Sequence, residues 1–224
     1  MGKRGVSPKG KIKILWSPNF AYAIGLLASD GCVGKNGRHL NLTSKDKEMV
    51  TNFLKGLNID CHIGKKNSGS VKEKKYFVVQ IGDVLFCKFL MKIGIMPAKS
   101  KIIGKVDVPG EYFFDFARGL FDGDGSTYSY FDPRWPSSFM FYLSFASASK
   151  KHIDWLRREF WHRLKIKGHV TQNGSLRMFQ LKYAKRESLI IIKKMYHFPS
   201  ALSLTRKRLK IQKMLGIVGE KLYN

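Results

Sequence analysis

The sequence predicts an α+β fold in which two pseudo-symmetric αββαββα units follow one another along the chain. The first observation is an internal repeat: segment 25–31 (GLLASDG) resembles segment 119–125 (GLFDGDG), and segment 77–81 resembles segment 179–183 at a similar spacing. The second is that each copy alternates helical periodicity with runs of alternating apolar and polar residues. The third is the length of 224 residues, which suffices for two such units, each with a core.

In the first copy, Ser17-Pro18 is typical of a helix start, and we expect this helix to reach Asp30, with Gly31 as its stop. A β-ribbon is expected next over 32–44, with Asn36-Gly37 as its turn. The remaining elements of this copy are expected to be a helix, a second ribbon and a closing helix, over 46–57, 61–82 and 84–95.

The second copy repeats this order, and the one large change in the spacing between the copies lies between Thr127 and Tyr142. This change locates an insertion around Pro133 and Pro136, which suits a long hairpin loop. The later elements are expected to be a helix, a ribbon and a closing helix, over 150–164, 168–183 and 186–196. We divide the chain into a basic N-terminal arm, a first unit and a second unit, over 1–16, 17–109 and 110–224.

The chain is strongly basic, because 41 Lys and Arg residues against 16 Asp and Glu residues give a formal net charge of +25. Such an excess opposes compaction by self-repulsion, so it predicts a polyanionic partner. With 44% hydrophobic and 13% aromatic residues, the chain is not a disordered basic tail. We therefore expect a folded protein that binds nucleic acid.

Several other classes of protein are excluded. The three cysteines contain no CxxC pair and the histidines show no HxxxH spacing, which argues against a disulfide scaffold and a zinc site. No apolar stretch reaches the ~18–20 residues that span a bilayer, and the charged N-terminus has no apolar signal region. We expect an intracellular protein without a membrane partner, in the cytoplasm or nucleoid of a prokaryote or in an organelle matrix.

The predicted ribbons have one apolar and one polar face, because apolar residues such as Leu40 and Leu42 alternate with polar ones. A two-stranded ribbon fits the DNA major groove, where Asn, Gln, Arg and Lys read base edges. The alternative is an ordinary solvated face, but the charge favours antiparallel ribbons that form a DNA-binding saddle. The predicted contacts to double-stranded DNA are Arg38, His39, Asn41, Thr43, Lys45, Tyr76, Gln80, Arg134, Tyr142, Ser144, Arg177, Gln180 and Lys182.

Small residues recur four positions apart in both Asp-Gly helices, Gly25 with Ser29 and Gly119 with Gly123. Positions i and i+4 share one helix face, and small side chains there let two helix backbones approach closely. If these faces pack together, the acids that end the two helices meet.

Two such acids at helix C-termini repel each other and the helix dipole, so we expect a cation between them. Carboxylate oxygens suit Mg²⁺, with Mn²⁺ as a substitute. The alternative is that both aspartates merely cap helices or begin turns; their repetition in so basic a chain favours the metal.

The segments AIGLLASDG (23–31) and ARGLFDGDG (117–125) resemble the two copies of the LAGLIDADG motif of homing endonucleases. The resemblance covers nearly the whole chain, through both motifs and both pairs of ribbons. The first segment departs from the motif at Ala28, where the family often has Asp, whereas Asp122 holds that position in the second.

The resemblance implies that Asp30 and Asp124 bind the catalytic divalent metal, and we assign the matching closing glycines, Gly31 and Gly125, to the same site. It also implies a basic residue near each scissile phosphate, after each closing helix. In the first unit this residue is Lys99 or Lys101, with preference for Lys99, and in the second it is Lys207. The alternative is that the C-terminal basic run containing Lys207 only clamps phosphates.

The resemblance further implies a monomeric, site-specific endonuclease that hydrolyses both strands of a long asymmetric duplex site across the minor groove, leaving short 3′ overhangs. Two alternatives stay open: a non-catalytic DNA-binding regulator and a maturase that binds intron RNA. Retention of Asp30 and Asp124 argues against the regulator. We expect a free-standing or intron-encoded protein rather than an intein.

Overall fold

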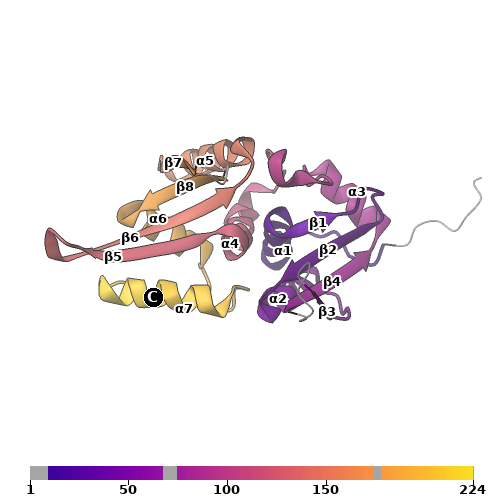
Figure 1. Ribbon diagram of the computed structural model, residues 1–224, viewed down its shortest axis with the longest axis horizontal. Coiled ribbons are helices and arrows are strands. Elements are labelled where there is room, and N and C mark those ends of the chain that lie inside the picture. The colour runs from indigo at the N-terminus through magenta and orange to yellow at the C-terminus, as the bar shows by residue number, and fades with distance from the viewer. Residues whose placement is uncertain (1–9, 68–74, 174–177, 224) are drawn as a thin grey trace, which may run out of the picture.

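The structure is a computed structural model that describes residues 10–67, 75–173 and 178–223. Within these ranges it contains seven α-helices and two four-stranded antiparallel sheets (Figure 1). The elements of the first half are α1 (Pro18–Ser29), β1 (Gly31–Val33), β2 (His39–Ser44), α2 (Lys47–Leu57), β3 (Gly64–Lys66), β4 (Tyr76–Gly82) and α3 (Val84–Lys92). A 3-10 turn, η1 (Lys99–Lys101), follows α3.

The second half opens with the 3-10 turn η2 (Gly110–Tyr112), directly after the predicted unit boundary. Its elements are α4 (Phe113–Asp124), β5 (Ser126–Asp132), β6 (Trp135–Ser147), α5 (Lys150–Leu164), β7 (His169–Asn173), β8 (Met178–Ala184) and α6 (Lys185–Met195). The predicted α+β class and the two αββαββα units are therefore confirmed.

One further helix, α7 (Thr205–Ile217), comes after the second unit and was not predicted. The most obvious feature of this segment in the sequence is its run of positively charged residues. Its Ile211, Met214 and Leu215 are nevertheless buried at helical spacing, and this apolar stripe fixes the helix against the rest of the protein. Tertiary packing, rather than the charge pattern, determines the structure here.

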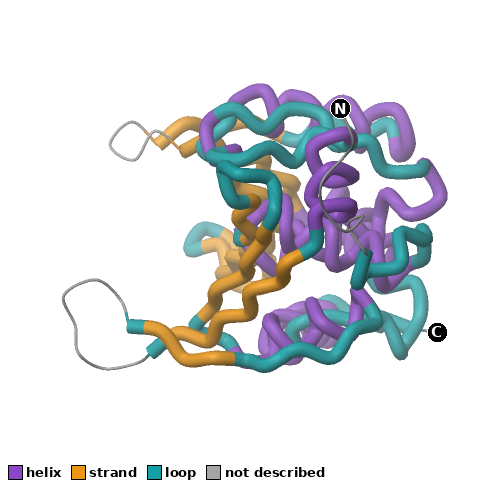
Figure 2. Tube along the Cα trace, turned by 90° about the vertical axis from the view of Figure 1, so that its right-hand side faces the viewer, coloured by secondary structure: helices purple, strands orange, loops and turns teal. Residues whose placement is uncertain are grey.

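In each half the two ribbons join into one sheet, with the strand orders β1-β2-β4-β3 and β5-β6-β8-β7. The joining pairs are β2 with β4 and β6 with β8, both antiparallel. In the first sheet, Leu40 pairs with Ile81 and Leu42 with Val79, and all four side chains are buried. The predicted alternation of faces is thus present, and Figure 2 shows helices gathered on one side of the strands.

The predicted insertion forms the long β5–β6 hairpin, which extends away from the centre of the molecule in Figure 1. Its turn lies at Pro133 and Arg134, and the register shifts between Phe131 and Asp132. Proline and aspartate residues favour such a turn.

Local signals explain where the first helix begins and ends. Ser17 caps α1, because its Oγ accepts a hydrogen bond of 3.1 Å from the Phe20 amide. The helix ends at Ser29 with Asp30 as its C-cap, directly before Gly31, as expected. Gly31 does not, however, have the left-handed conformation of a common glycine stop, because the described glycines with positive φ are Gly37, Gly94, Gly168 and Gly219. Gly31 is instead required by close approach: a Cβ there would lie 2.7 Å from the Leu27 Cα.

Residues 10–16, which the sequence assigns to the basic arm, lie against the first half of the protein. The Asp83 carboxylate accepts hydrogen bonds from the Lys11 and Ile12 amides at 2.6 and 2.9 Å, and the Ile12 side chain is buried. The rest of the predicted arm, 1–9, lies outside the described residues.

Candidate functional site

Helices α1 and α4 pack against each other at the centre of the molecule, between the two sheets (Figure 1). A Cβ on Gly25 would lie 2.9 Å from the Gly119 Cα and would strike the Phe116 carbonyl oxygen. A Cβ on Gly119 would likewise lie 2.9 Å from the Gly25 Cα and would strike the Tyr22 carbonyl oxygen. The two backbones are therefore in contact at these glycines, because no side chain fits between them.

The same small-residue faces bring the C-terminal ends of the two helices together. A Cβ on Gly123 would strike the Ser29 hydroxyl and the Asp30 carboxylate, so α4 meets the end of α1 at this point. The Ser29 Oγ donates to the Gly25 and Leu26 carbonyls, which keeps this side chain against its own helix. Both Asp30 and Asp124 remain exposed to solvent at the ends of their helices.

The two carboxylates influence each other's ionisation. Partial desolvation by the packed helix ends, and then the nearby Asp30 charge, raise the pKa of Asp124 to about 6, although the side chain still reaches solvent. Burial also raises the pKa of Asp30, against a hydrogen bond from Ser29 and the charges of Lys207 and Lys99. A bound cation would relieve this cost, so two accessible oxygen donors of this kind fit a hard divalent metal.

A lysine ammonium group lies at the end of each of these helices. Lys99 Nζ donates to the Ser29 carbonyl at 3.2 Å and to the Gly31 carbonyl at 2.5 Å. Lys207 Nζ lies within hydrogen-bond distance, 2.5 to 3.2 Å, of four carbonyl oxygens at the end of α4, those of Phe121, Asp122, Gly123 and Gly125, which share its three N–H groups. The two lysines hold pseudo-equivalent positions, and each is fixed against the helix that carries an aspartate.

Both ammonium groups are desolvated. Burial lowers the pKa of Lys99, with Asp124 and Asp30 acting in the opposite direction. Burial lowers the pKa of Lys207 to about 8, and the Asp122 charge opposes this shift. Lys101, the other candidate, is exposed on the same 3-10 turn as Lys99, so the geometry favours Lys99.

The closing glycines, which the sequence assigned to the metal, accept hydrogen bonds from these lysines through their carbonyl oxygens. Gly31 accepts from Lys99 and Gly125 accepts from Lys207 at 2.7 Å. Each carbonyl oxygen has a second lone pair, but an ammonium group already lies beside it. Among the described residues, no group of three or more His, Cys, Asp or Glu side chains gathers as a metal site. The oxygen donors available to a metal are thus chiefly the two aspartates.

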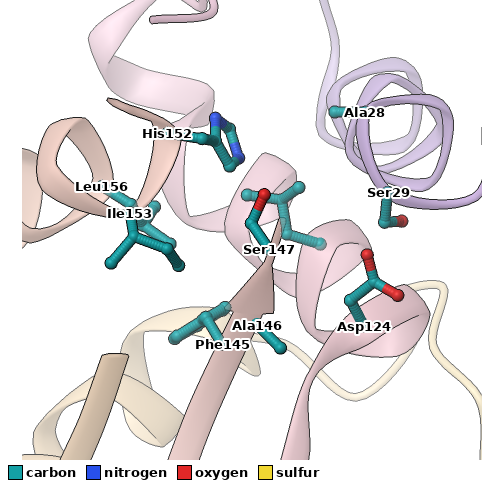
Figure 3. A pocket seen from close by; sticks show the side chains of 10 residues that line it. Ala28, Ser29, Asp124, Phe145, Ala146, Ser147, His152, Ile153 and Leu156 are labelled. Carbon is teal, nitrogen blue, oxygen red and sulfur yellow. The ribbon is translucent and has the colours of Figure 1, made fainter. Parts of the chain in front are cut away.

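A small hollow opens beside Asp124, between α1 and the second sheet (Figure 3). Its wall includes Ser29 at the end of α1, Ser147 at the end of β6 and His152 of α5. His152 Nδ1 makes a hydrogen bond of 2.7 Å to the Gly104 carbonyl, and burial lowers the pKa of the imidazole. This histidine is therefore a neutral structural group that ties α5 to the segment between the two halves.

Asp122 is a buried polar residue whose role the motif pattern did not reveal. Its Oδ2 accepts hydrogen bonds of 2.7 Å from the Tyr22 hydroxyl and from the Leu204 amide. Burial raises its pKa to about 6, against these two hydrogen bonds. It joins α1, α4 and the start of α7, three segments that are distant in sequence, and no local signal marks such a contact.

The outward face of the first sheet carries most of the DNA-contact residues predicted there. Asn41 lies opposite Gln80, with the exposed Cys32 on its other side. The Lys45 ammonium lies 5.5 Å above the Tyr76 ring. The remaining predicted residues of this sheet, which also lie outside the core, are Arg38, His39 and Thr43.

The outward face of the second sheet is richer in tyrosine. The rings of Tyr130 and Tyr142 are stacked with centroids 6.4 Å apart, and Tyr128 contacts Tyr130 at 5.5 Å. Tyr128 and Tyr130 were not predicted, although they alternate with Ser129 and so share one strand face. A hollow on this face is lined by Ser126, Tyr128, Tyr130, Tyr142, Ser144, Gln180 and Lys182.

Two predicted DNA contacts lie apart from this face. Arg134 is at the tip of the β5–β6 hairpin, where it pairs with Asp132 at 3.0 Å. Arg177 lies outside the described residues. Among the described helices, none is long and apolar enough to cross a membrane.

The fold is similar to those of several solved structures. The homing endonuclease I-WcaI bound to its DNA recognition sequence has a TM-score of 0.62 and 12% identity, over 93% of this chain and 95% of that one. I-DmoI in complex with DNA and Ca has a TM-score of 0.55 and 13% identity, over 87% and 97%. The N-terminal LAGLIDADG domain of DUF199/WhiA has a TM-score of 0.53 and 14% identity, over 90% and 89%.

No family model and no curated protein matches the sequence. The structural similarity, at such low identity, establishes the fold. The chain has the LAGLIDADG fold in its single-chain form with two motifs, and the resemblance predicted from the two motif segments is confirmed at this level.

Proposed function

We propose that the protein is a site-specific endonuclease that hydrolyses both strands of a DNA duplex with the help of divalent metal. The observation that carries this proposal is the pair of helix ends. Two exposed aspartates and two desolvated lysine ammonium groups converge where α1 and α4 meet. Such a combination of oxygen donors and fixed cations suits a phosphodiester, whose charge increases during hydrolysis.

Similar solved structures support DNA as the substrate and a divalent ion as the cofactor. I-WcaI is bound to its DNA recognition sequence, and I-DmoI is in complex with DNA and either Ca or Mn. The net charge of +25 gives this chain the attraction to a polyanion that such binding needs. The polar outward faces of both sheets provide surfaces for contact with base edges.

The roles of the site residues follow from their chemistry. Asp30 and Asp124 would hold the metal, with Mg²⁺ as the expected ion and Mn²⁺ as a substitute. When bound, a divalent ion lowers the pKa of a water and neutralises phosphate charge. Lys99 and Lys207 would stabilise negative charge on the scissile phosphates, one on each strand. With a pKa of about 8, Lys207 still carries its proton at neutral pH.

One copy of the chain would suffice for the reaction. Both aspartates and both lysines belong to the same polypeptide, and the two motif helices already pack on each other. We therefore propose that the protein acts as a monomer on a site whose two halves differ in sequence, because the two sheet faces differ.

The proposal is tested by selecting a duplex target from a randomised library in Ca²⁺ and then assaying cleavage of that target in Mg²⁺. The wild-type protein should linearise a plasmid that carries the target. Asp30→Asn and Asp124→Asn should each abolish linearisation while affinity for the target persists, because each removes a metal ligand but little surface. Asp107→Asn, at an exposed carboxylate that pairs with Lys105, should cut like the wild type.

Near wild-type cleavage by either motif variant would contradict the assignment of the metal ligands. A second candidate function is DNA binding without cleavage, which the likeness to the WhiA domain and the lysine-bonded Gly31 and Gly125 carbonyls favour. Tight sequence-specific binding with no cleavage in Mg²⁺ or Mn²⁺ would establish that function instead.

A further inference from the structure

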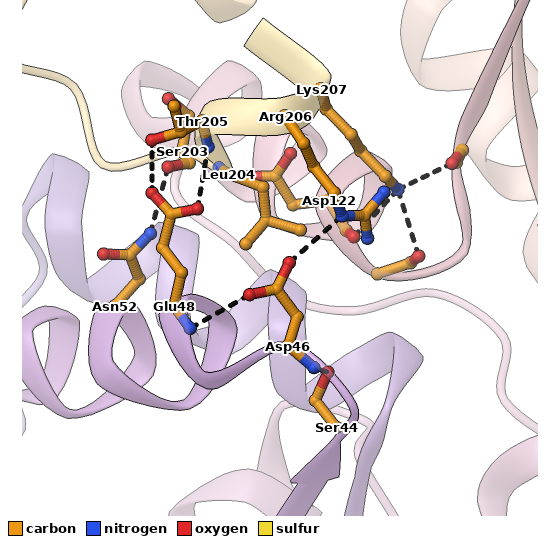
Figure 4. A network of polar contacts seen from close by, with 12 residues as sticks. Ser44, Asp46, Glu48, Asn52, Asp122, Ser203, Leu204, Thr205, Arg206 and Lys207 are labelled. Carbon is orange, nitrogen blue, oxygen red and sulfur yellow. Dashed lines mark hydrogen bonds and ion pairs between the residues drawn. The ribbon is translucent and has the colours of Figure 1, made fainter. Parts of the chain in front are cut away.

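The two lysines at the helix ends are held by different parts of the chain. Lys99 lies on η1, directly after the first unit, and is only 5% exposed. Lys207 lies in the first turn of α7, and the start of α7 rests on α2, a helix of the first half (Figure 4). The position of Lys207 therefore depends on contacts between the two halves as well as on its own contacts with the end of α4.

Glu48 of α2 makes the closest of these contacts. One oxygen of its carboxylate accepts a hydrogen bond of 3.0 Å from the Thr205 amide, and the other accepts one of 2.5 Å from the Thr205 hydroxyl (Figure 4). Glu48 thus binds the first residue of α7 through two atoms at once, which fixes both the position and the direction of the helix start.

Neighbouring side chains of the first half reinforce this contact. Asn52 donates to the Ser203 carbonyl at 3.0 Å, in a buried position. Arg206 pairs with Asp46 at 3.0 Å, although the arginine side chain is 60% exposed and so contributes little. The segment immediately before Lys207 is consequently held at three places by residues of α2 and its N-cap.

Helix α7 needs such a partner because it has no cap of its own. Its N-cap residue is Leu204, whose side chain cannot accept a hydrogen bond from the first turn. The amides of a helix start must find acceptors, and here Glu48 accepts from Thr205 while Asp122 accepts from Leu204. A carboxylate at this end also interacts favourably with the helix dipole.

We propose that Glu48 is a positioning residue, which caps α7 from the other half of the chain and thereby fixes Lys207 at the end of α4. The inference rests on the proposed function for its consequence in cleavage. Loss of Glu48 should release the start of α7 and displace the Lys207 ammonium from its carbonyls. Lys99, which η1 holds independently of α7, should stay in place.

The decisive comparison uses three variants. Glu48→Ala removes both acceptors. Glu48→Gln keeps an acceptor for the Thr205 amide and offers an amide group to its hydroxyl, so it should rescue the contact. Glu220→Ala is the matched control, because it removes the same charge from a carboxylate of the second half whose ion-pair partner, among the residues that the structure describes, is Lys193.

The first measurement is independent of DNA. Hydrogen exchange of the amides in 204–208 should accelerate roughly 2- to 30-fold in Glu48→Ala, the factor that corresponds to loss of a helix cap. Acylation of the Lys207 amine, followed by mass spectrometry, should accelerate as well, while that of Lys99 should not. Glu48→Gln and Glu220→Ala should resemble the wild type in both measurements.

The second measurement is single-turnover cleavage of the selected plasmid at saturating protein. Glu48→Ala should slow cleavage of one strand roughly 10- to 100-fold, the effect of displacing a reacting group by about 1 Å, so nicked circles should accumulate. Target affinity and cleavage of the other strand should change less than about twofold, and Glu48→Gln should restore linear product. A merely structural role would slow both strands equally and lower the melting temperature.

The two measurements separate failure of this inference from failure of the proposed function. Unchanged exchange and unchanged acylation of Lys207 in Glu48→Ala would overturn the positioning role, whether or not the protein cuts DNA. Equal slowing of both strands would overturn it too. Should the wild type cut no DNA, the endonuclease proposal fails, and the exchange and acylation data still decide whether Glu48 fixes Lys207.

If Glu48→Ala does not fold, Thr205→Val removes only the hydroxyl contact and should give a smaller effect of the same kind.

Discussion

The two halves of the chain differ most in the segment after their closing helix. After α3 the chain makes only the short turn η1, and Lys99 on that turn donates to the end of α1. After α6 it adds the 13-residue helix α7, and Lys207 on α7 donates to the end of α4. The two lysines thus reach equivalent positions from different elements. The two halves are therefore alike at the ends of α1 and α4 and differ in the segments that hold the lysines there.

The outward sheet faces differ as well. In the first sheet an amide pair, Asn41 opposite Gln80, occupies the centre of the face. In the second, three tyrosines, Tyr128, Tyr130 and Tyr142, contact one another along the hairpin. Amides can discriminate base edges through two hydrogen bonds, whereas clustered tyrosines offer mainly apolar area and single hydroxyls. The two halves are therefore suited to half-sites of different sequence.

The symmetric part of the molecule should be the least tolerant of change, and Gly119→Ala is the sharpest test. A Cβ at Gly119 would enter the backbone of α1, so the helices must separate, at a cost of roughly 1–3 kcal/mol or more. The matched control is Gly216→Ala in α7, where a Cβ meets no atom within 4 Å. That change should raise the unfolding free energy by about 0.5–1 kcal/mol, because alanine is the better helix former.

Chemical denaturation of both variants measures the two effects. Opposite signs are expected, although the substitution is the same. Equal stabilities for Gly119→Ala and the wild type would contradict the close backbone contact between α1 and α4.

The junction between the halves should make stability depend on pH. The pKa of Asp122, about 6 in the folded protein, lies above the ~3.9 of an unfolded chain, so the folded state binds more protons between these values. The unfolding free energy should therefore fall as pH rises from about 4 to about 6, by about 2–3 kcal/mol from this residue. The raised pKa values of Asp124 and Asp30 act in the same direction.

Two variants should alter this pH dependence in opposite ways. Asp122→Asn removes the titrating group and should flatten the curve. Tyr22→Phe removes a hydrogen bond that favours the charged carboxylate, so it should raise the pKa further and steepen the curve. Urea denaturation of both variants at pH 4 and pH 7 measures the change, and an unaltered curve in Asp122→Asn would contradict the assignment.

The fold could be predicted largely from the sequence because the repeat and the periodicities are local signals. Ser17 marks the start of α1, Asn36-Gly37 marks a turn, and Gly25 with Gly119 marks the faces that pack. Each of these signals depends on a few adjacent residues and one elementary constraint, so each can be interpreted without the structure.

The parts that could not be predicted depend on contacts between distant segments. The choice of Lys99 over Lys101 requires knowing which one reaches the Gly31 carbonyl. The role of Asp122 depends on Leu204, and that of Glu48 on Thr205, and nothing near either acid in the sequence indicates its partner. Helix α7 was hidden because its positive charges outnumber its buried apolar residues.

The difference between the two sheet faces leads to a prediction about specificity. If the first face reads base edges, Gln80→Ala should relax discrimination at one base position by about 1–3 kcal/mol, the value of a bidentate amide contact. Tyr142→Phe, on the second face, removes only one hydroxyl and should change discrimination less. Binding to a library of single-position target variants measures both, and a uniform loss across all positions for Gln80→Ala would indicate a face that does not read sequence.

The smallest expected effect concerns charge on the second face. Lys182 lies beside Ser144 on the outward side of that sheet, so its ammonium can neutralise one phosphate. If the whole protein neutralises roughly 6–10 phosphates, affinity should fall by about 10³–10⁵ between 50 and 200 mM salt. Lys182→Ala should then weaken binding to all sequences alike and reduce the salt slope by at most about one unit.

Lys55→Ala is the control, because this exposed lysine belongs to α2, whose apolar residues pack on the buried side of the first sheet. An equal decrease in slope for both variants would mean that DNA contacts are spread over the whole basic surface rather than concentrated on the outward faces.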